Sequence, residues 1–212
     1  ASVYQYADLP SGYTFGIIAT TPDSSLAYED FEAMKGITFG MVKTYVRRGE
    51  FLHYLADNGI RSPKIREYNS TAELLDALEK GQIDAMVHTF MEIKEGQRLV
   101  GRFAPRPFYY ITYPGNDDVI RELNYAITDL KMSAPELESK LMNKYYQSRL
   151  DKTIVFTTSE KEYIANAGRI SVGYYDGYYP FIYEDEGECK GLTRELLDGA
   201  AAVAGLTLSW HK

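Results

Sequence analysis

Short apolar runs alternate with helix-like segments through the first part of this chain, and this alternation restricts its fold more than any other feature. The runs are bounded by Gly, Pro, Asn, Asp or Ser, as β-strands commonly are. The expected strands comprise residues 13–19, 37–42, 65–68 and 83–87. The order of strands and helices predicts an α/β fold with a parallel-rich sheet, helices on its faces and right-handed crossovers.

Capping residues mark the boundaries of the two main helices between these strands. Thr44 directly follows the second strand and occupies the position of a helix N-cap, and residues 58–59, Asn-Gly, are expected to end that helix. Ser70 and Glu73 have capping-box spacing in front of a leucine-rich helix that Gly81 ends. Both helices therefore have a predicted beginning and end.

Further helical segments are expected on either side of this group. A short helix at 27–34 is predicted to stop at Gly36, and a helical turn is predicted near 90–95. Two successive helices are predicted at 118–130 and 135–146. Their expected apolar faces comprise Val119, Leu123, Ile127 and Leu130, followed by Leu137, Leu141 and Tyr145.

A second α/β pattern begins after an expected boundary near Asp151. Thr157 and Glu160 again have capping-box spacing, which predicts a helix that runs to Asn166. A strand at 170–174, a turn at Gly187, a helix at 192–204 and a strand at 206–210 are expected to follow. A lone strand–helix–strand cannot close a core of its own, so something must complete it.

Composition excludes several classes of function. The chain has 212 residues, with 23 Lys and Arg against 30 Asp and Glu, a formal net charge of −7. Nucleic acid is therefore not an expected partner, because phosphate binding requires a basic surface. No apolar run approaches the roughly 20 residues of a membrane-spanning helix, so contact with a membrane is expected only through segments outside this chain.

The sequence shows no pattern typical of catalysis or of a cofactor. Cys189 is the single cysteine, so neither an internal disulfide nor a cysteine-rich zinc site is expected. His53, His88 and His211 lack metal-ligand spacing, and there is no glycine-rich phosphate loop or Gly-x-Ser-x-Gly motif. We therefore expect a binding protein without a cofactor rather than an enzyme.

Several segments together resemble family 3 of the bacterial extracellular solute-binding proteins. Residues 30–43 look like the start of the second lobe in this family. Residues 74–87, a leucine-rich helix followed by Gly and then Asp-Ala-Met-Val, match it well, and 108–113 resemble its return strand. Residues 172–181 and 191–196 resemble the beginning of its first lobe. The resemblance implies a periplasmic-binding-protein-like lobe plus part of a second lobe.

The order of these segments differs from that of a single family member. Residues 1–112 resemble a second lobe with its hinge strands, and 113–150 the helices that return to a first lobe. Residues 151–168 then form a helical linker, and 169–212 begin a new first lobe. We interpret the chain as the junction of two tandem flytrap domains. In the alternative interpretation the late strand–helix–strand docks on the early helices and rebuilds part of a lobe.

Two groups of residues follow strands where ligands bind in open parallel sheets. The first is Lys43, Thr44 and Tyr45, where free backbone N–H groups can accept a carboxylate while Lys43, Arg47 or Arg48 adds positive charge. The alternative is that Thr44 only caps a helix. The family often has Gly-Ser or Gly-Thr here, so Thr44-Tyr45 departs from its pattern.

The second group is His88 and Thr89, at the end of the fourth expected strand. Family members that bind amino acids often have an acid here, whereas this chain has Thr89. The difference favours a ligand other than a standard zwitterionic amino acid, or a different way of holding such a ligand. His88 is either a ligand contact or pH-responsive group, or a solvated or locally bonded residue. The resemblance implies further ligand-contacting residues, namely Tyr109, Tyr175, Asp176, Tyr178, Tyr179 and Phe181.

The resemblance implies an extracytoplasmic sensor region that closes around a small polar solute and signals through a membrane-anchored parent protein. Three alternatives remain open: the substrate-binding component of a transporter, a dehydratase or wall-active enzyme, and a structural spacer with an empty cleft. If the late segment exchanges with a neighbouring chain, a homodimer is expected.

Overall fold

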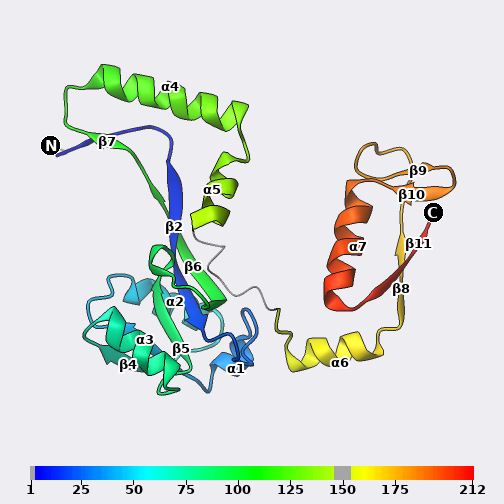
Figure 1. Cartoon of the computed structure of the whole chain (residues 1–212), viewed down its shortest axis with the longest axis horizontal. Coiled ribbons are helices and arrows are strands. Elements are labelled where there is room, and N and C mark those ends of the chain that lie inside the picture. Colours follow the sequence, from blue (N-terminus) through cyan, green and yellow to red (C-terminus); the bar gives the residue numbers. More distant parts are fainter. Residues whose placement is uncertain (1–2, 146–153) are drawn as a thin grey trace. The chain divides into compact units, whose positions relative to one another are not determined.

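The computed structural model describes residues 3–145 and 154–212, which divide into two compact units, Ala1–Val155 and Phe156–Lys212 (Figure 1). The expected boundary at Asp151 lies outside the described residues. Each unit is considered by itself below.

The first unit is built on a five-stranded sheet with the strand order β4-β3-β5-β2-β6. Its strands are β2 (Gly12–Thr20), β3 (Thr38–Val42), β4 (Lys64–Tyr68), β5 (Ala85–Thr89) and β6 (Arg98–Phe108). The adjacent strands β4, β3 and β5 are parallel, as predicted, whereas β2 runs antiparallel to both β5 and β6. The sheet is therefore mixed. Two helical crossovers impose the parallel order on β3, β4 and β5, whereas β2 enters beyond β5 from the opposite end.

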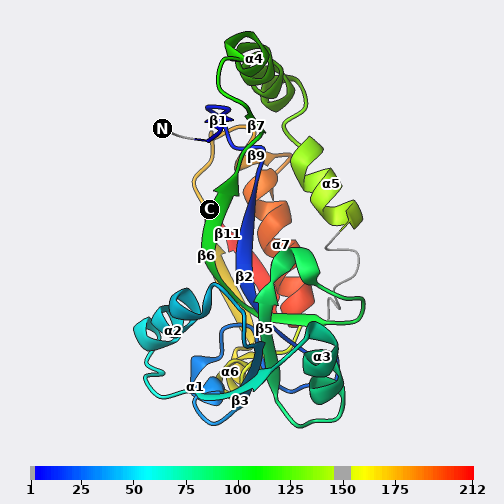
Figure 2. The same cartoon turned by 90° about the vertical axis from the view of Figure 1, so that its left-hand side faces the viewer.

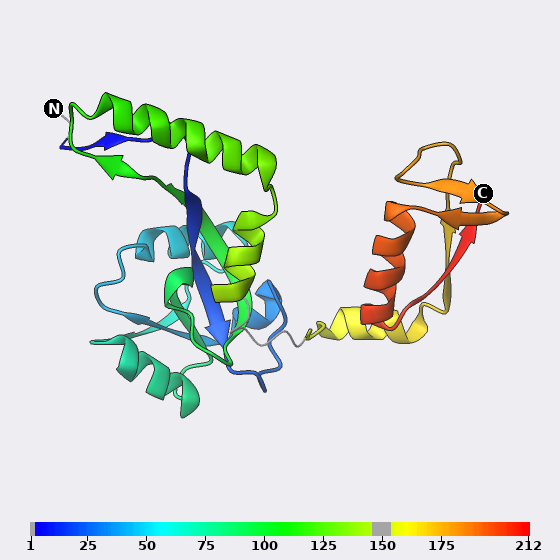
Figure 3. The ribbon, with the colours of Figure 1, turned by 45° about the horizontal axis from the view of Figure 1, so that its top comes forward.

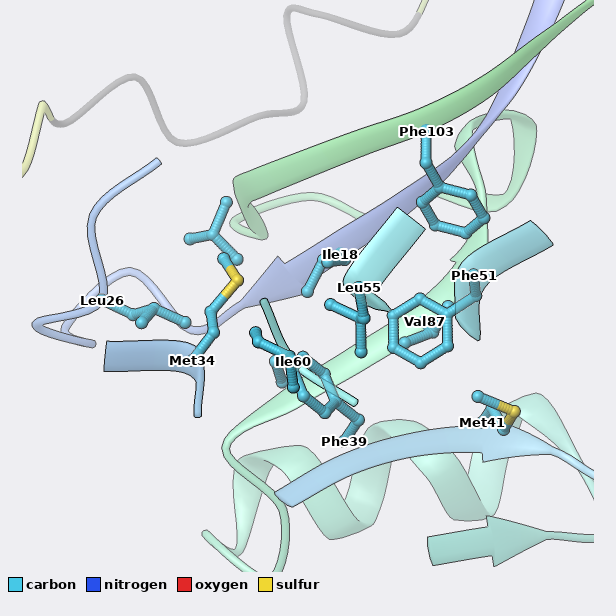
Figure 4. Close-up of a cluster of buried hydrophobic side chains, with 12 residues drawn as sticks. Ile18, Leu26, Met34, Phe39, Met41, Phe51, Leu55, Ile60, Val87 and Phe103 are labelled. Atoms are coloured by element: carbon cyan, nitrogen blue, oxygen red, sulfur yellow. The ribbon is translucent and has the colours of Figure 1, made fainter. Parts of the chain in front are cut away.

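Helices cover both faces of this sheet (Figure 2). On one face α1 (Phe31–Met34) and α2 (Arg48–Asp57) enclose a cluster that contains Phe39, Phe51 and Phe103 (Figure 4). The ring of Phe51 lies 5.3 Å from that of Phe39 and 5.6 Å from that of Phe103. On the other face α3 (Thr71–Glu79) packs its buried Leu74, Ala77 and Leu78 against the sheet. Burial on both faces explains why residues 39–41 of β3 and 85–87 of β5 are apolar.

Two helices in this unit begin later than the sequence predicts. Thr44 does not cap α2: it lies in an exposed turn, and the helix begins at Arg48 after Arg47, whose side chain makes no capping bond. The short helix α1 is confined to 31–34, because the Glu29 N–H bonds to the Val100 carbonyl and so holds the preceding residues in an irregular segment. Tertiary hydrogen bonds thus override the local pattern.

Other predicted boundaries are confirmed. The Ser70 hydroxyl accepts a bond from the Glu73 N–H at the start of α3, although the Glu73 carboxylate accepts from the Asn69 N–H instead of completing a capping box. Gly59 and Gly81 both have positive φ directly after their helices. The helical turn near 90–95 is the 3₁₀ helix η1 (Phe90–Glu92).

The remaining elements of the first unit extend beyond the central sheet (Figure 1). The short strand β1 (Gln5–Tyr6) pairs with β7 (Ile111–Thr112), and the helices α4 (Asp117–Ser133) and α5 (Leu137–Tyr145) follow. The predicted inner face of α4 is partly wrong, because Ile120 and Ile127 are buried while Val119 and Leu130 remain about half exposed. Tyr146, the expected last residue of the second helix, lies outside the described residues.

The second unit contains the elements that the sequence predicts together with one hairpin (Figure 3). A complete capping box starts α6 (Thr158–Asn166), and α7 (Leu192–Ala204) ends at Gly205, which has a left-handed conformation. The strands β8 (Arg169–Gly173) and β11 (Thr207–His211) pair in parallel. Gly187 turns a hairpin of β9 (Tyr183–Asp185) and β10 (Glu188–Lys190).

We predict that Phe51→Ala lowers the free energy of unfolding of the first unit by about 3–5 kcal/mol, because the ring is fully buried between two other rings. Val46→Ala is the matched control, since Val46 is 94% exposed and should change the value by less than about 0.5 kcal/mol. Urea denaturation followed by circular dichroism measures both. Equal effects of the two variants would contradict this account of the core.

Candidate functional site

The carboxyl ends of β3, β4 and β5 form one edge of the sheet in the first unit. The three strands are neighbours and parallel, and their last residues are Val42, Tyr68 and Thr89. The segments that follow these strands therefore meet at this edge. In open α/β sheets ligands bind there.

Lys43 and Asn69 are linked across two of these strand ends. The ammonium group of Lys43 donates to Oδ1 of Asn69 at 2.8 Å, and the backbone N–H of Lys43 donates to the Tyr68 carbonyl at 2.9 Å. Asn69 is held in turn by the carboxylate of Glu73, which accepts from both its backbone N–H and its side-chain amide. Lys43 and Asn69 are exposed, so they present a cation and an amide to solvent.

Tyr45 connects the same edge to β5. Its hydroxyl donates to the backbone carbonyl of His88 at 3.2 Å. Burial raises the pKa of the Tyr45 hydroxyl to about 12, against the opposing effects of Arg47 and of a hydrogen bond with Thr89. Tyr45 and Thr89 are half-buried neutral groups at neutral pH. Together with Lys43 and Asn69 they form a polar edge that can hydrogen bond to a small solute; we refer to these four residues as the strand-end site.

His88 lies beneath this edge rather than on it. Its side chain is 3% exposed, and its residue pairs with Ile17 of β2 inside the sheet. Burial, with a smaller contribution from Lys94, lowers the pKa of His88 to about 4, so the ring is neutral at physiological pH. Neither ring nitrogen has a hydrogen-bond partner within the described part of the chain. The structure therefore buries His88 in the sheet, away from the solvent-exposed groups of the strand-end site.

The two arginines near the edge are already engaged. Arg47 is 5% exposed, its Nε lies 2.9 Å from Oε2 of Glu50, and its guanidinium also donates to the Ala104 carbonyl. Arg48 forms an ion pair with Glu67. Of the three basic side chains that the sequence suggested, Lys43 is the one that the strand-end site presents to solvent.

The remaining candidate residues lie elsewhere. Tyr109 is partly exposed beyond the central sheet, where its ring meets that of Tyr6 edge-on at 6.3 Å. The aromatic candidates of the second unit are all largely exposed, namely Tyr175, Tyr178, Tyr179 and Phe181. Asp176 accepts a bond from the Glu184 N–H at 2.8 Å and pairs with Lys212 at 3.1 Å. These contacts order the loop of the second unit.

Sequence reasoning missed Asn69. Its signal was its position, directly after an expected strand and directly before the capping Ser70. Within residues 3–145 and 154–212, no group of three or more His, Cys, Asp or Glu side chains is arranged to hold a metal ion. In the same ranges, no helix combines the length and apolar character needed to cross a membrane.

Comparison with known proteins identifies the fold of this chain. No family model matches the sequence, and no curated protein matches it. Among solved structures, the second substrate-binding domain of a putative amino-acid ABC transporter from Streptococcus pneumoniae matches with a TM-score of 0.57 and 19% identity, over 68% of this chain and 65% of that one. Substrate-binding domain 2 of Lactococcus lactis GlnP, in an open conformation, matches with a TM-score of 0.55 and 18% identity, over 68% of this chain and 63% of that one.

A third match spans almost the whole chain. The periplasmic domain of B. pertussis BvgS aligns with 99% of this chain and 42% of that one, at a TM-score of 0.48 and 15% identity. The first two matches show that this chain has the fold of a periplasmic-binding-protein-like lobe, as the sequence predicted. The chain spans just under two thirds of the length of those two structures.

We predict that acid destabilises the first unit through His88. The pKa of His88 is about 4 in the folded state and about 6.5 in the unfolded state, so the unfolded state binds the extra proton as the pH falls through this window. The free energy of unfolding should fall by roughly 3 kcal/mol between pH 7 and pH 4 from this group alone.

The His88→Leu variant should lose that part of the pH dependence, as measured by urea denaturation at several pH values. His53→Gln is the matched control, because the side chain of His53 is 81% exposed. In this variant the free energy of unfolding should depend on pH as it does in the parent protein. If the free energy of unfolding of His88→Leu depended on pH as strongly as that of the parent protein, His88 would not be the source of the acid sensitivity.

Proposed function

We propose that this chain is part of an extracytoplasmic protein that binds a small polar solute, and that the strand-end site supplies the contacts of one lobe. The observation that carries the proposal is the convergence of Lys43, Asn69, Tyr45 and Thr89 at one edge of three parallel strands. The likeness in fold to substrate-binding domains of amino-acid transporters supports it.

The positive charge of Lys43 favours a solute with an anionic group, although the carboxylate of Glu92 acts on Tyr45 at the same edge. The carboxylate of Glu67 is paired with Arg48, and that of Glu73 is bonded to Asn69. Lys43 is bonded to a neutral amide, so its positive charge is not neutralised by that contact. A carboxylate or a similar group on the solute would form a charge-assisted bond with Lys43, while Asn69 and Thr89 contribute neutral hydrogen bonds.

We further propose that the parent protein is a sensor, in which closure of two lobes around the solute is passed to a membrane-anchored output domain. The succession of two α/β units in one chain supports this proposal. The alternative is the substrate-binding component of an ABC transporter, which the first two structural matches favour. An output domain such as a kinase or cyclase encoded downstream would distinguish the sensor from the transporter.

Catalysis on this fold would require acids or a histidine that converge on the bound solute. Among the acids near this edge, Glu67 and Glu73 are engaged with protein groups, Glu92 acts on Tyr45 through its charge, and His88 is buried in the sheet. These contacts support a binding role rather than that of a dehydratase or a wall-active enzyme.

We predict that the chain binds a solute from a panel of amino acids, small carboxylates, polyamines and short peptides at millimolar concentration. A ligand at about 100 times its dissociation constant adds roughly 2.7 kcal/mol, which raises the melting temperature by a few degrees. Lys43→Met should weaken binding of an anionic hit about tenfold or more, as measured by isothermal titration calorimetry.

Lys80→Met is the matched control, because Lys80 is an exposed lysine that pairs with Asp76 on the surface of the first unit. It should leave binding unchanged. A flat thermal response of a cooperatively unfolding protein to the whole panel would contradict the proposed function. Equal loss in the two lysine variants would contradict the strand-end site.

A further inference from the structure

The side-chain amide of Asn69 lies between two groups of opposite charge at the strand-end site. Its Oδ1 accepts from the ammonium group of Lys43 at 2.8 Å, and its Nδ2 donates to Oε2 of Glu73 at 3.3 Å. An ammonium group can only donate a hydrogen bond, and an ionised carboxylate can only accept one. The two neighbours therefore fix the direction of the amide, with its oxygen toward Lys43.

Glu73 is itself held in place at the start of α3. It lies in the first turn of the helix, where its backbone N–H donates to the Ser70 hydroxyl at 3.2 Å. The carboxylate oxygen that accepts from the Asn69 amide also accepts from the Asn69 backbone N–H at 3.0 Å. The partial positive charge at a helix N-terminus favours a carboxylate in this turn. A group fixed on regular secondary structure thus sets the orientation of Asn69.

The side chain of Lys43 depends on this amide to remain at the edge. Its backbone N–H is bonded to the Tyr68 carbonyl at 2.9 Å, which ties the main chain at the end of β3 to β4. Its ammonium group is exposed, and within residues 3–145 and 154–212 its hydrogen bond goes to Asn69. If the amide turned over, its N–H groups would face the ammonium group, and two donors cannot bond to each other.

We propose that Glu73 is a positioning residue for solute binding: through Asn69 it holds the ammonium group of Lys43 where an anionic solute meets the edge. The inference rests on the proposed function and adds to it a residue that needs no contact with the solute. A side chain that is ordered before binding loses less rotational freedom when the solute arrives. For one lysine this difference corresponds to about three- to tenfold in affinity.

The charge of Glu73 separates this role from a direct electrostatic one. A carboxylate near the site repels an anionic solute, so its removal should strengthen binding if charge alone mattered. If Glu73 acts by positioning Lys43, its removal should weaken binding instead. The two explanations predict changes of opposite sign for the same substitution.

The test uses succinate, a small dicarboxylate, and succinamide, its neutral diamide. Each is titrated into the full chain at millimolar concentration and followed in the NMR spectrum of the backbone amides. Succinate should shift the signals of residues 43–45, 69 and 89 and bind more tightly than succinamide. Glu73→Ala should weaken succinate binding about three- to tenfold. Glu73→Gln should retain most of the affinity, because its side-chain carbonyl can still accept from Asn69.

Two variants of the same helix are the matched controls. Ser70→Ala removes the cap of α3 and leaves the carboxylate that bonds to Asn69, and Glu79→Ala removes an exposed carboxylate from the last turn of α3. Neither should weaken succinate binding, and circular dichroism checks the fold of every variant. Glu73→Ala should cause no further loss when it is added to Asn69→Ala, because Glu73 acts through Asn69.

The possible results separate this inference from the proposed function. If the parent chain binds succinate and Glu73→Ala binds it equally well or more tightly, the positioning role is wrong and the proposed function stands. An equal loss in Ser70→Ala would assign the effect to the start of α3, and a further loss on top of Asn69→Ala would exclude Asn69 as the intermediary; either result overturns the inference. A parent chain whose strand-end signals do not respond to succinate would contradict both the anionic solute and the role of Glu73.

Discussion

Burial of both faces of β3 and β5 is the constraint on which the rest of the first unit depends. Phe39 and Met41 of β3 face the cluster under α2, whereas Gly40 faces α3 so closely that a side chain there would meet Leu74 and Ile83. The two crossover helices can pack this tightly only if the strands between them run parallel. The parallel order in turn brings three carboxyl ends to one edge and so creates the strand-end site.

A buried polar network joins this core to the long strand β6. Arg47, at the start of α2, lies over the ring of Phe103 and bonds both to Glu50 and to the carbonyl of Ala104. Ala104 has a positive φ, where the register between β2 and β6 shifts. Removing one member of such a network leaves a buried charge without its partner, which is strongly destabilising. We therefore assign Arg47 a structural role in holding the irregular part of β6.

Much of this architecture follows from local patterns. The Ser70 cap, the Thr157–Glu160 capping box and the glycines at 59, 81 and 205 act within one helical turn, so their effects were correctly predicted. The expectation that Thr44 caps α2 was wrong, because the chain makes a turn after β3 in which the Tyr45 N–H bonds back to the Val42 carbonyl. The lobe assignments, the ligand contacts of the second unit and the choice between sensor and transporter stay predictions.

The sequence by itself determined the elements, their order and the α/β class, because strand and helix periodicity and capping are local properties of the chain. It also placed Lys43, Tyr45, His88 and Thr89 at strand ends. Only the tertiary structure decided which of them reach solvent. Lys43 extends toward Asn69, whereas His88 is buried, which lowers its pKa. The neighbouring Arg47 is held by an ion pair with Glu50. Burial depends on which strands become neighbours, and that choice rests on contacts between residues far apart in the chain.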